Sequence, residues 1–473
     1  MMFLSCSFVA FHPKPKDQKP LSNLFSSGYQ LFSQKQYQQA LPLFYEFLNT
    51  HTQDDDNYSW ALFFLGISLR ENGFKHASFD VFTRLIEQSP NAKIVTHVLL
   101  FLETAINQGD IGEDYIRETV FCSKNFGYVE APLSAFIDYH QGMCNWQKGY
   151  IDWGNTQFEK IPQNSIYYLK YQYELARLMI QTNDIQKSIE ILENILNSEI
   201  LTPSLFEKTC ITLARLFYEQ KKYLRADQLY QKIHKYHPEQ SRFLLERAWT
   251  HYHSGKPDSA LGLLIGLNSP DLNHQITPEY FLLKALLYKD VCNYQKALTI
   301  VDEFYAKYQT LINDIKNRHQ WVNQRQALQL LSQKKTIYQE LHVLTDLENE
   351  QISIKHIPNK SLSDHLQNTY LILMNKHKNK LRTIAQKEYE RMSNQLLTFE
   401  ENMRLMNYEI GLDMYQRVKQ FTNRPKHKST TFKIDNPVIY PFIDEYWNDE
   451  LDDLRVSLTN RCQTLEEWDI FFK

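Results

Sequence analysis

Two histidine pairs have spacings that metal ligands can have. His234 and His237 are three residues apart, and His251 and His253 are two apart. Side chains three apart share one face of a helix, so two imidazoles could reach the same metal ion. No cysteine and no clear third ligand accompany the first pair, which lies in a turn before Pro238. We therefore predict neither a metal site nor a cofactor.

A cluster of carboxylates near the C-terminus is the second candidate for chemistry. Clustered carboxylates can hold Ca²⁺ or act as acid and base, but these lack the spacing of a calcium loop and have no histidine or glycine turn beside them. We predict a solvated acidic face. An enzyme-like or glycan-binding role of this segment is the alternative, which Asp444→Asn or Glu450→Gln would test. The cluster contains Asp444, Glu445, Asp449, Glu450, Asp452 and Asp453.

The motifs of common enzyme classes are missing from the sequence. It contains no glycine-rich phosphate loop, no nucleophile elbow, no HExxH and no dinucleotide fingerprint. Its 52 Lys and Arg residues nearly balance its 55 Asp and Glu residues, and the net charge of −3 argues against a nucleic-acid partner. We predict a protein that is not an enzyme and does not bind nucleic acid.

The composition favours a helical protein. Only 13 glycines and 16 prolines occur among 473 residues, so β-hairpins have little raw material, whereas the 43% of hydrophobic residues suffices for a sizeable core. No run approaches the roughly 20 apolar residues that a transmembrane helix needs. We expect helices that do not cross a membrane.

The N-terminus and the cysteines bear on localisation. Residues 2–11 are an apolar run similar to the end of a secretion signal, although no basic residue precedes it. Residues 3–6 loosely resemble a lipobox, so Cys6 could be lipidated, whereas an ordinary signal peptidase could instead cut after Ser7. The six scattered cysteines suggest buried thiols, but Cys122 and Cys144 could form a disulfide in an exported protein. The alternative is a cytoplasmic protein with an N-terminal tail.

An internal repeat dominates residues 21–308. A small residue recurs twelve positions before another small residue, and a large apolar residue often follows four positions after the second. Two antiparallel helices explain this pattern, because Ala or Gly is needed where their backbones approach. The clearest pairs are Gly28/Ala40, Ala176/Ser188, Ala214/Ala226, Ala248/Ala260 and Ala285/Ala297.

Other parts of this region fit the register less well. Leu65 stands where a small residue is expected ahead of Ala77, although Gly66 is adjacent, and Trp153 occupies a small-residue position. We expect the unit around Trp153 to pack differently from the others. Residues 94–126 are predicted to form a further helix pair whose type the pattern does not define.

The repeat resembles the tetratricopeptide repeat (TPR) family. Second small positions fall at residues 188, 226, 260 and 297, in steps of 38, 34 and 37 residues, near that family's period of about 34. The likeness is clearest in residues 213–230, with Pro238 expected to close the second helix. The resemblance implies an all-α fold, a TPR-like α-solenoid that is a superhelix of antiparallel helix pairs.

Such a superhelix usually binds an extended peptide or a partner helix on the concave face lined by its first helices. The residue after the first small position should point inward, and Arg and aromatic residues are frequent interface anchors. The family's chaperone-tail clamp has Asn at two of these positions, occupied here by Arg177 and Arg215, so that particular ligand is not expected. The candidate partner-binding residues are Arg177, Arg215, Tyr218, Trp249, Tyr252 and His253.

Beyond residue 308 the repeat signature stops, and residues 309–421 are predicted to form a long helical hairpin. Apolar residues recur at helical spacing through residues 361–421, a helix of roughly 90 Å that cannot bury its apolar stripe alone. A preceding helix over about 311–349, packed antiparallel, is the favoured partner. A coiled coil with another protein would satisfy the same pattern.

Residues 422–473 are predicted to be a linker followed by an aromatic and acidic C-terminal docking segment, and residues 1–20 a signal or linker. The tail contains the string Tyr440-Pro441-Phe442 … Glu445-Tyr446-Trp447 … Asp449-Glu450-Leu451, ending in Arg461-Cys462. With this string it resembles the tail of envelope-associated TPR proteins of gliding and predatory bacteria. The resemblance implies a non-catalytic scaffold of the bacterial cell envelope, in the periplasm or anchored peripherally to a membrane, that binds other proteins in a motility or envelope complex. A cytoplasmic TPR adaptor is the alternative.

Overall fold

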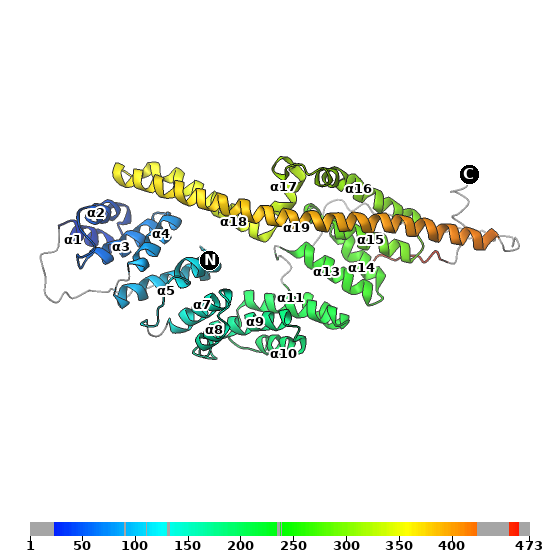
Figure 1. Ribbon diagram of the computed structural model, residues 1–473, viewed down its shortest axis with the longest axis horizontal. Helices are drawn as coiled ribbons and strands as arrows, with labels where there is room; N and C mark the ends of the chain where they lie inside the picture. Colours follow the sequence, from blue (N-terminus) through cyan, green and yellow to red (C-terminus); the bar gives the residue numbers. More distant parts are fainter. Residues whose placement is uncertain are drawn as a thin grey trace. The chain divides into compact units, whose positions relative to one another are not determined.

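The computed structural model describes residues 23–88, 91–109, 111–129, 133–233, 237, 239–422 and 454–462. Within these ranges the chain is all-α, as predicted: a TPR-like α-solenoid followed by a long helical hairpin (Figure 1). The chain divides into two compact units. One unit contains residues 1–162 and 341–379, and the other contains residues 163–340 and 380–473.

The first unit begins with four consecutive helix pairs. The third pair, predicted over residues 94–126, is irregular because its second helix continues as a π-helix, Arg117–Phe121. The α-helices of these pairs are α1 Asn23–Ser33, α2 Tyr37–Thr50, α3 Tyr58–Glu71, α4 Lys75–Glu87, α5 Ala92–Gln108, α6 Glu113–Ile116, α7 Ser134–Gln147 and α8 Ile151–Phe158.

The second unit contains the next four pairs. Its last pair differs from the expectation, since α16 continues to Lys316, past the point where the repeat signature stops. The helices are α9 Ile166–Gln181, α10 Ile185–Leu196, α11 Pro203–Glu219, α12 Tyr223–Tyr230, α13 Gln240–His253, α14 Pro257–Gly266, α15 Pro278–Asp290 and α16 Tyr294–Lys316. α12 therefore ends well before Pro238, which lies outside the described residues.

The small residues of the repeat lie where the two helices of a pair touch. A Cβ atom added to Gly28 would come within 3.0 Å of the Phe44 ring, and one added to Gly142 would come within 2.5 Å of the Phe158 ring. Each ring belongs to the residue sixteen positions later, on the second helix of the same pair. A larger side chain in the first helix would therefore force the two helices apart.

The register of two repeats differs by one residue from the prediction. Gly66, and not Leu65, faces the second helix, since its added Cβ would lie 2.6 Å from Phe82. Gly154, and not Trp153, occupies the second small position of the α7–α8 pair, and Trp153 is 67% exposed. The unit around Trp153 therefore packs like the others, and the expectation that it packs differently is wrong.

A left-handed turn residue joins the two helices in seven pairs. In each, the residue five positions before the second small residue has a φ between 58° and 88°, and in the α3–α4 pair, where Gly66 replaces Leu65, that second small residue is the buried Ser78 and not Ala77. Its N–H and the following N–H bond back to the first helix, as Lys221 does to the Tyr218 carbonyl and Lys222 to the Phe217 carbonyl, which is the Schellman pattern. The turn residues are Lys35, Gly73, Gly149, Asn183, Lys221, Gly255 and Cys292.

Replacing Lys221 by glycine should stabilise the protein. A lysine in the left-handed conformation costs the folded protein about 1–2 kcal/mol. Glycine removes this cost, but its greater conformational entropy in the unfolded chain offsets roughly half of the benefit. Lys221→Gly should therefore raise the free energy of unfolding by about 0.5–1 kcal/mol. Urea unfolding monitored by circular dichroism measures the gain. The control Lys208→Gly, at an exposed position inside α11, should lose about 1 kcal/mol. A loss at both positions would contradict the argument.

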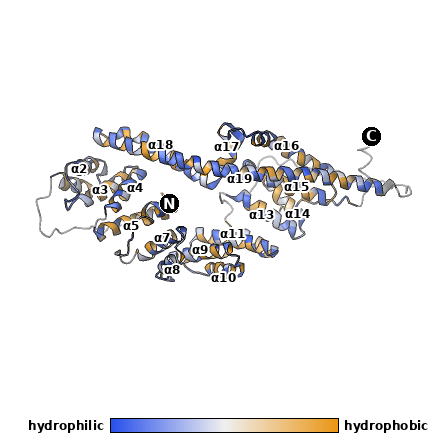
Figure 2. Ribbon diagram, in the orientation of Figure 1, coloured by the Kyte–Doolittle hydropathy of each residue, from blue (hydrophilic) through white to orange (hydrophobic). Residues whose placement is uncertain are grey.

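The hairpin follows the solenoid but is not built as predicted. A short helix α17 (Arg325–Ser332) precedes α18 (Lys335–Ser353), so the expected single helix over 311–349 is wrong. The long second helix is confirmed: α19 runs from Lys360 to Thr422, 63 residues, with hydrophobic and hydrophilic stretches alternating along it (Figure 2). α18 and α19 are antiparallel, because Glu350 bonds Tyr370 and Glu340 pairs with Lys380.

One stretch of the C-terminal segment is described, residues 454–462. It has no helix or strand and lies on the second unit, where a disulfide joins Cys462 to Cys292. We call these nine residues the strap. The carboxylate cluster of residues 444–453, the apolar run of residues 2–11 and Cys6 all lie outside the described residues.

Candidate functional site

The candidate site is an aromatic cluster formed by α11, α12 and α13. The exposed His253 ring lies nearly parallel to Trp249 (centroids 5.7 Å apart) and to Tyr223 (5.9 Å apart). Tyr218 and Tyr252 meet His253 edge-on, with centroids at 5.8 and 5.1 Å. Four of the six predicted site residues therefore lie together, joined by Tyr223. We call this group of five residues the aromatic cluster.

Local structure explains why these rings meet. Trp249, Tyr252 and His253 occupy the last turn and a half of α13, while Tyr223 begins α12 after the left-handed turn at Lys221. Side chains three and four apart share one face of a helix, so Trp249 and His253 point the same way. Because α12 and α13 belong to neighbouring repeats, the cluster joins two repeats.

Carboxylates adjoin the aromatic cluster. The Tyr252 hydroxyl donates a 2.7 Å hydrogen bond to Asp290. Burial, this hydrogen bond and the Asp290 charge raise the pKa of the Tyr252 phenol, so it stays protonated at neutral pH. Burial also raises the pKa of the Glu279 carboxyl on α15. A ligand side chain that is apolar or positively charged suits such a site, because cations are attracted to aromatic faces.

The two predicted arginines lie outside the aromatic cluster. Arg215 donates two hydrogen bonds to Glu246 of the next repeat, at 3.0 and 2.9 Å, and the Tyr230 hydroxyl donates a third to the same carboxylate at 2.7 Å. Arg215 therefore fixes one repeat against the next. Arg177 is more exposed and pairs with Glu174 on its own helix at 2.8 Å.

A second inter-repeat contact was not predicted from the sequence. Asp227 on α12 accepts a 2.9 Å hydrogen bond from Arg247 on α13, whose side chain is only 4% exposed, and lies 3.3 Å from His251. Burial raises the pKa of the Asp227 carboxyl, but the His251 hydrogen bond and the Arg247 and His251 charges lower it more, so the net pKa lies below its usual 3.8.

The histidines that might have bound a metal have other contacts. His237 packs on Phe243, with centroids 4.9 Å apart, and its ring accepts a hydrogen bond from the Glu239 N–H. His251 contacts Asp227, and His253 stacks in the aromatic cluster. His234 lies outside the described residues. No group of three His, Cys, Asp or Glu side chains suitable for a metal occurs in the part of the chain that the structure describes.

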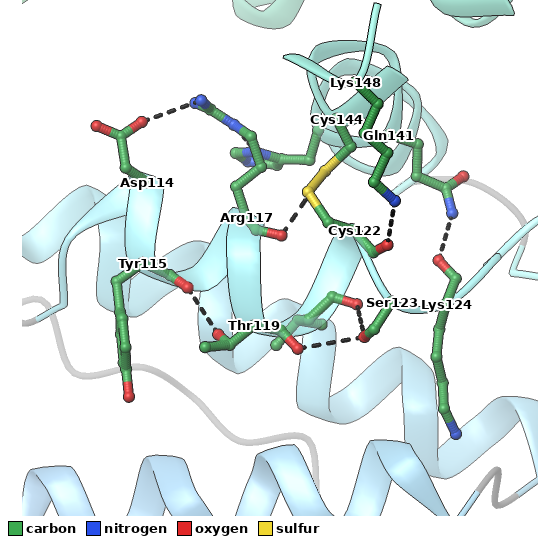
Figure 3. The surroundings of a disulfide bond; sticks show 12 residues. Asp114, Tyr115, Arg117, Thr119, Cys122, Ser123, Lys124, Gln141, Cys144 and Lys148 are labelled. Carbon is green, nitrogen blue, oxygen red and sulfur yellow. Dashed lines mark hydrogen bonds and ion pairs between the residues drawn. A yellow bond between two sulfur atoms is a disulfide. The ribbon is translucent and has the colours of Figure 1, made fainter. Parts of the chain in front are cut away.

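The Cys122–Cys144 disulfide, which the sequence allowed for an exported protein, is present (Figure 3). It ties the end of the π-helix to α7, and Lys148 donates a 2.8 Å hydrogen bond to the Cys122 carbonyl beside it. An open cavity of about 390 Å³ adjoins the disulfide, with the exposed Trp153 among its lining residues. None of the described helices is long and apolar enough to cross a membrane.

Comparison with known proteins finds a family match over part of this site. The tetratricopeptide repeat family model matches residues 212–239, which include Arg215, Tyr218, Tyr223 and Asp227. None of the curated proteins compared with the chain is similar to it. Among solved structures, yeast Tom70 is 16% identical, with 81% of this chain and 96% of that chain covered and a TM-score of 0.20. A circular tandem repeat protein with a novel repeat topology is 12% identical, with 82% and 90% covered and a TM-score of 0.11.

Proposed function

We propose that this protein is a non-catalytic scaffold that binds a peptide or helix of a partner protein at the aromatic cluster. TPR solenoids are generally protein-interaction scaffolds, and one repeat here matches the family by sequence. The observation that carries the proposal is the partly exposed stack of Trp249, His253 and Tyr223 across two repeats. Rigid aromatic side chains lose little entropy on binding, which is why they often act as interface anchors.

Replacing His253 by alanine should weaken partner binding while leaving the fold intact. His253 is exposed and contributes no buried hydrogen bond, so His253→Ala should lower recovery of a crosslinked partner at least fivefold and shift the unfolding temperature by less than about 2 °C. A photo-crosslinking amino acid at position 223 of the aromatic cluster, with His253 either kept or replaced by alanine, identifies the contact, and one at the exposed Tyr338 of α18 is the control. Equal crosslinking at both positions would contradict the site.

The arginines predicted as contacts are poorer tests of binding. Arg215→Glu would place a second negative charge against Glu246 and should destabilise the solenoid, so lost binding would not distinguish contact from folding. Arg177→Glu is safer because its ion pair is exposed, and exposed pairs contribute about 0–1 kcal/mol. The partner-binding role of both arginines remains a prediction.

The proposed location is the bacterial cell envelope. Disulfides persist in oxidising compartments such as the periplasm, and the two between Cys122 and Cys144 and between Cys292 and Cys462 support export. The tail's resemblance to envelope TPR proteins of gliding bacteria supports a motility or envelope complex. Anchoring through Cys6 would add peripheral membrane association. A cytoplasmic adaptor is the competing proposal.

Fractionation of cells that express the native gene with its upstream region should recover the protein in the periplasm or with the envelope. Protease access in spheroplasts and the mass of the mature N-terminus provide the measurement, and a lipid-modified Cys6 would identify the anchor. Free, alkylatable Cys122 and Cys144 in a cytosolic fraction would contradict export and would favour the competing proposal of a cytoplasmic adaptor.

A further inference from the structure

The strap lies on the second unit as an extended peptide with alternating sides. Leu454, Val456 and Leu458 are half-buried, whereas Arg455 and Ser457 between them are exposed. Val456 and Leu458 pack against the core that α13 to α16 build. Successive side chains of an extended chain point to opposite sides, so every second residue enters the protein.

Main-chain contacts hold the strap along α14 and the turn that follows α15. The Val456 and Leu458 N–H groups donate to the carbonyl oxygen (3.2 Å) and to the carboxylate (2.8 Å) of Asp258. The Arg461 N–H donates to the Val291 carbonyl at 2.9 Å. These contacts recognise a backbone and not particular side chains, as in other sites that bind extended peptides.

Gly262 of α14 makes room for the strap. A Cβ atom added to Gly262 would lie 1.8 Å from the Leu454 carbonyl oxygen, which is too close for any side chain. The strap backbone thus lies directly on the helix backbone. Together, Asp258 and Gly262 on α14 and the Val291 carbonyl form a surface shaped for an extended chain, which we call the strap site.

The disulfide that holds the strap has a cation beside one sulfur. The Arg417 guanidinium lies 2.8 Å from Cys292 Sγ and also donates to the Cys462 carbonyl at 2.9 Å. A guanidinium stabilises a neighbouring thiolate, and a better-stabilised leaving thiolate speeds thiol–disulfide exchange. Cys292 and Cys462 are both partly exposed, whereas Cys144 of the other disulfide is buried.

We propose that the strap site is a binding site for an extended peptide of a partner protein, that the chain's own residues 454–462 occupy it, and that thiol–disulfide exchange at Cys292–Cys462 opens it. The ligand is an extended segment with apolar residues at every second position. This proposal goes beyond binding at the aromatic cluster and uses different residues, so either can fail without the other.

The exchange step requires a dithiol as reductant. One thiolate of the dithiol attacks Cys462 Sγ, the disulfide breaks, and Cys292 leaves as the thiolate next to Arg417. The second thiol of the reductant then attacks the mixed disulfide and releases Cys462. Two electrons pass to the protein disulfide, the two thiol protons end on Cys292 and Cys462, and the reductant becomes a cyclic disulfide.

The first test compares the two disulfides in the full-length oxidised protein. Under limiting dithiothreitol, differential alkylation and mass spectrometry should show Cys292–Cys462 reduced at least tenfold faster than Cys122–Cys144. Arg417→Gln should slow only the first reaction, several-fold, whereas the control Arg404→Gln, at an exposed arginine of the same helix, should slow neither. Equal reduction rates for the two disulfides in the unsubstituted protein would contradict the proposal that Cys292–Cys462 is the more easily reduced disulfide.

Release of the strap is measured by the rate at which trypsin cleaves after Arg455 and Arg461. Reduction should raise cleavage at these sites at least tenfold. Gly262→Ala should raise cleavage after Arg455 without reduction, because it displaces the strap near Leu454 and leaves the disulfide in place. Unchanged cleavage after reduction would show that the strap stays bound and would contradict opening.

Peptide binding is tested on a chain whose own strap binds poorly. The full-length Val456→Asp, Leu458→Asp variant, once reduced, should bind a fluorescein-labelled peptide of residues 454–462 carrying Cys462→Ser. The same variant in its oxidised form should bind at least tenfold more weakly, because the tethered strap still covers the site, and adding Asp258→Ala should abolish binding. No saturable binding, or equal binding by both forms, would overturn the proposal.

Discussion

Asp227→Ala should be among the most destabilising single substitutions in the second unit. It would remove the carboxylate that the Arg247 guanidinium, 4% exposed, contacts at 2.9 Å. Removing one partner of a buried ion pair costs about 3–5 kcal/mol. Because this pair joins α12 to α13, the loss should separate neighbouring repeats. Hydrogen exchange of α12 and α13, together with urea unfolding, measures the effect.

Two comparisons make the Asp227 prediction specific. Asp227→Asn retains an acceptor and should cost about 1–2 kcal/mol, and Glu174→Ala, which breaks the exposed pair with Arg177, should cost less than about 0.5 kcal/mol. If the three variants lose equal stability, the buried pair is not the cause.

The same contact gives stability a pH dependence. The pKa of Asp227 is lower in the folded protein than its usual 3.8, so its contribution is complete above that value and is lost as pH falls through the lowered pKa. The unsubstituted protein should therefore lose more stability below about pH 4 than Asp227→Asn does. If the free energy of unfolding falls equally with pH in the two proteins, the pKa of Asp227 is not lowered in the folded protein.

Glu350→Leu should release the end of the hairpin in the first unit. The buried Glu350 carboxylate accepts hydrogen bonds from the Tyr370 hydroxyl at 2.5 Å, the His76 ring at 2.9 Å and the His76 N–H at 3.1 Å. It thereby joins α18 and α19 and caps the start of α4, where the helix dipole favours a negative charge. We expect a loss of about 3 kcal/mol, because buried donors would lose their acceptor.

Hydrogen exchange of residues 341–379 tests this prediction locally. Protection there should fall about a hundredfold in Glu350→Leu, while α13 to α16 in the second unit stay unchanged. The matched control is Glu348→Ala, at an exposed position two residues away on the same helix, which should leave exchange unaltered. A uniform rise in both units would show that the whole chain had been destabilised instead.

Local patterns in the sequence sufficed to predict the helix pairs. Small residues twelve apart mark the contact between two helices, and the apolar stripe of α19 is visible over its whole length. Register failed at Gly66 and Gly154 because each has a neighbour that also fits the pattern: Gly66 follows Leu65 in a wholly buried stretch, and Trp153 precedes Gly154. The correct register is evident only from the structure, in which Gly66 faces Phe82 and Gly154 faces Trp146.

The candidate site was only partly predictable for a different reason. Spacing within one repeat was enough to group Trp249, Tyr252 and His253, because they lie on one helix. It could not show that Arg215 pairs with Glu246, or that Asp227 pairs with Arg247, since these partners lie 31 and 20 residues apart on different helices. Pairings such as His76 with Glu350, separated by 274 residues, have no local signature.

The division of the chain into two units has a consequence for biosynthesis. The first unit contains residues 1–162 and 341–379, so its helix pairs emerge from the ribosome long before the hairpin segment that packs on them. At 5–20 residues per second, the roughly 220 residues that separate residue 162 from residue 379 take about 10–40 s to synthesise. During that interval α4 is exposed without the Glu350 carboxylate at its N-terminus. A nascent chain of this protein would thus offer chaperones a defined and time-limited target.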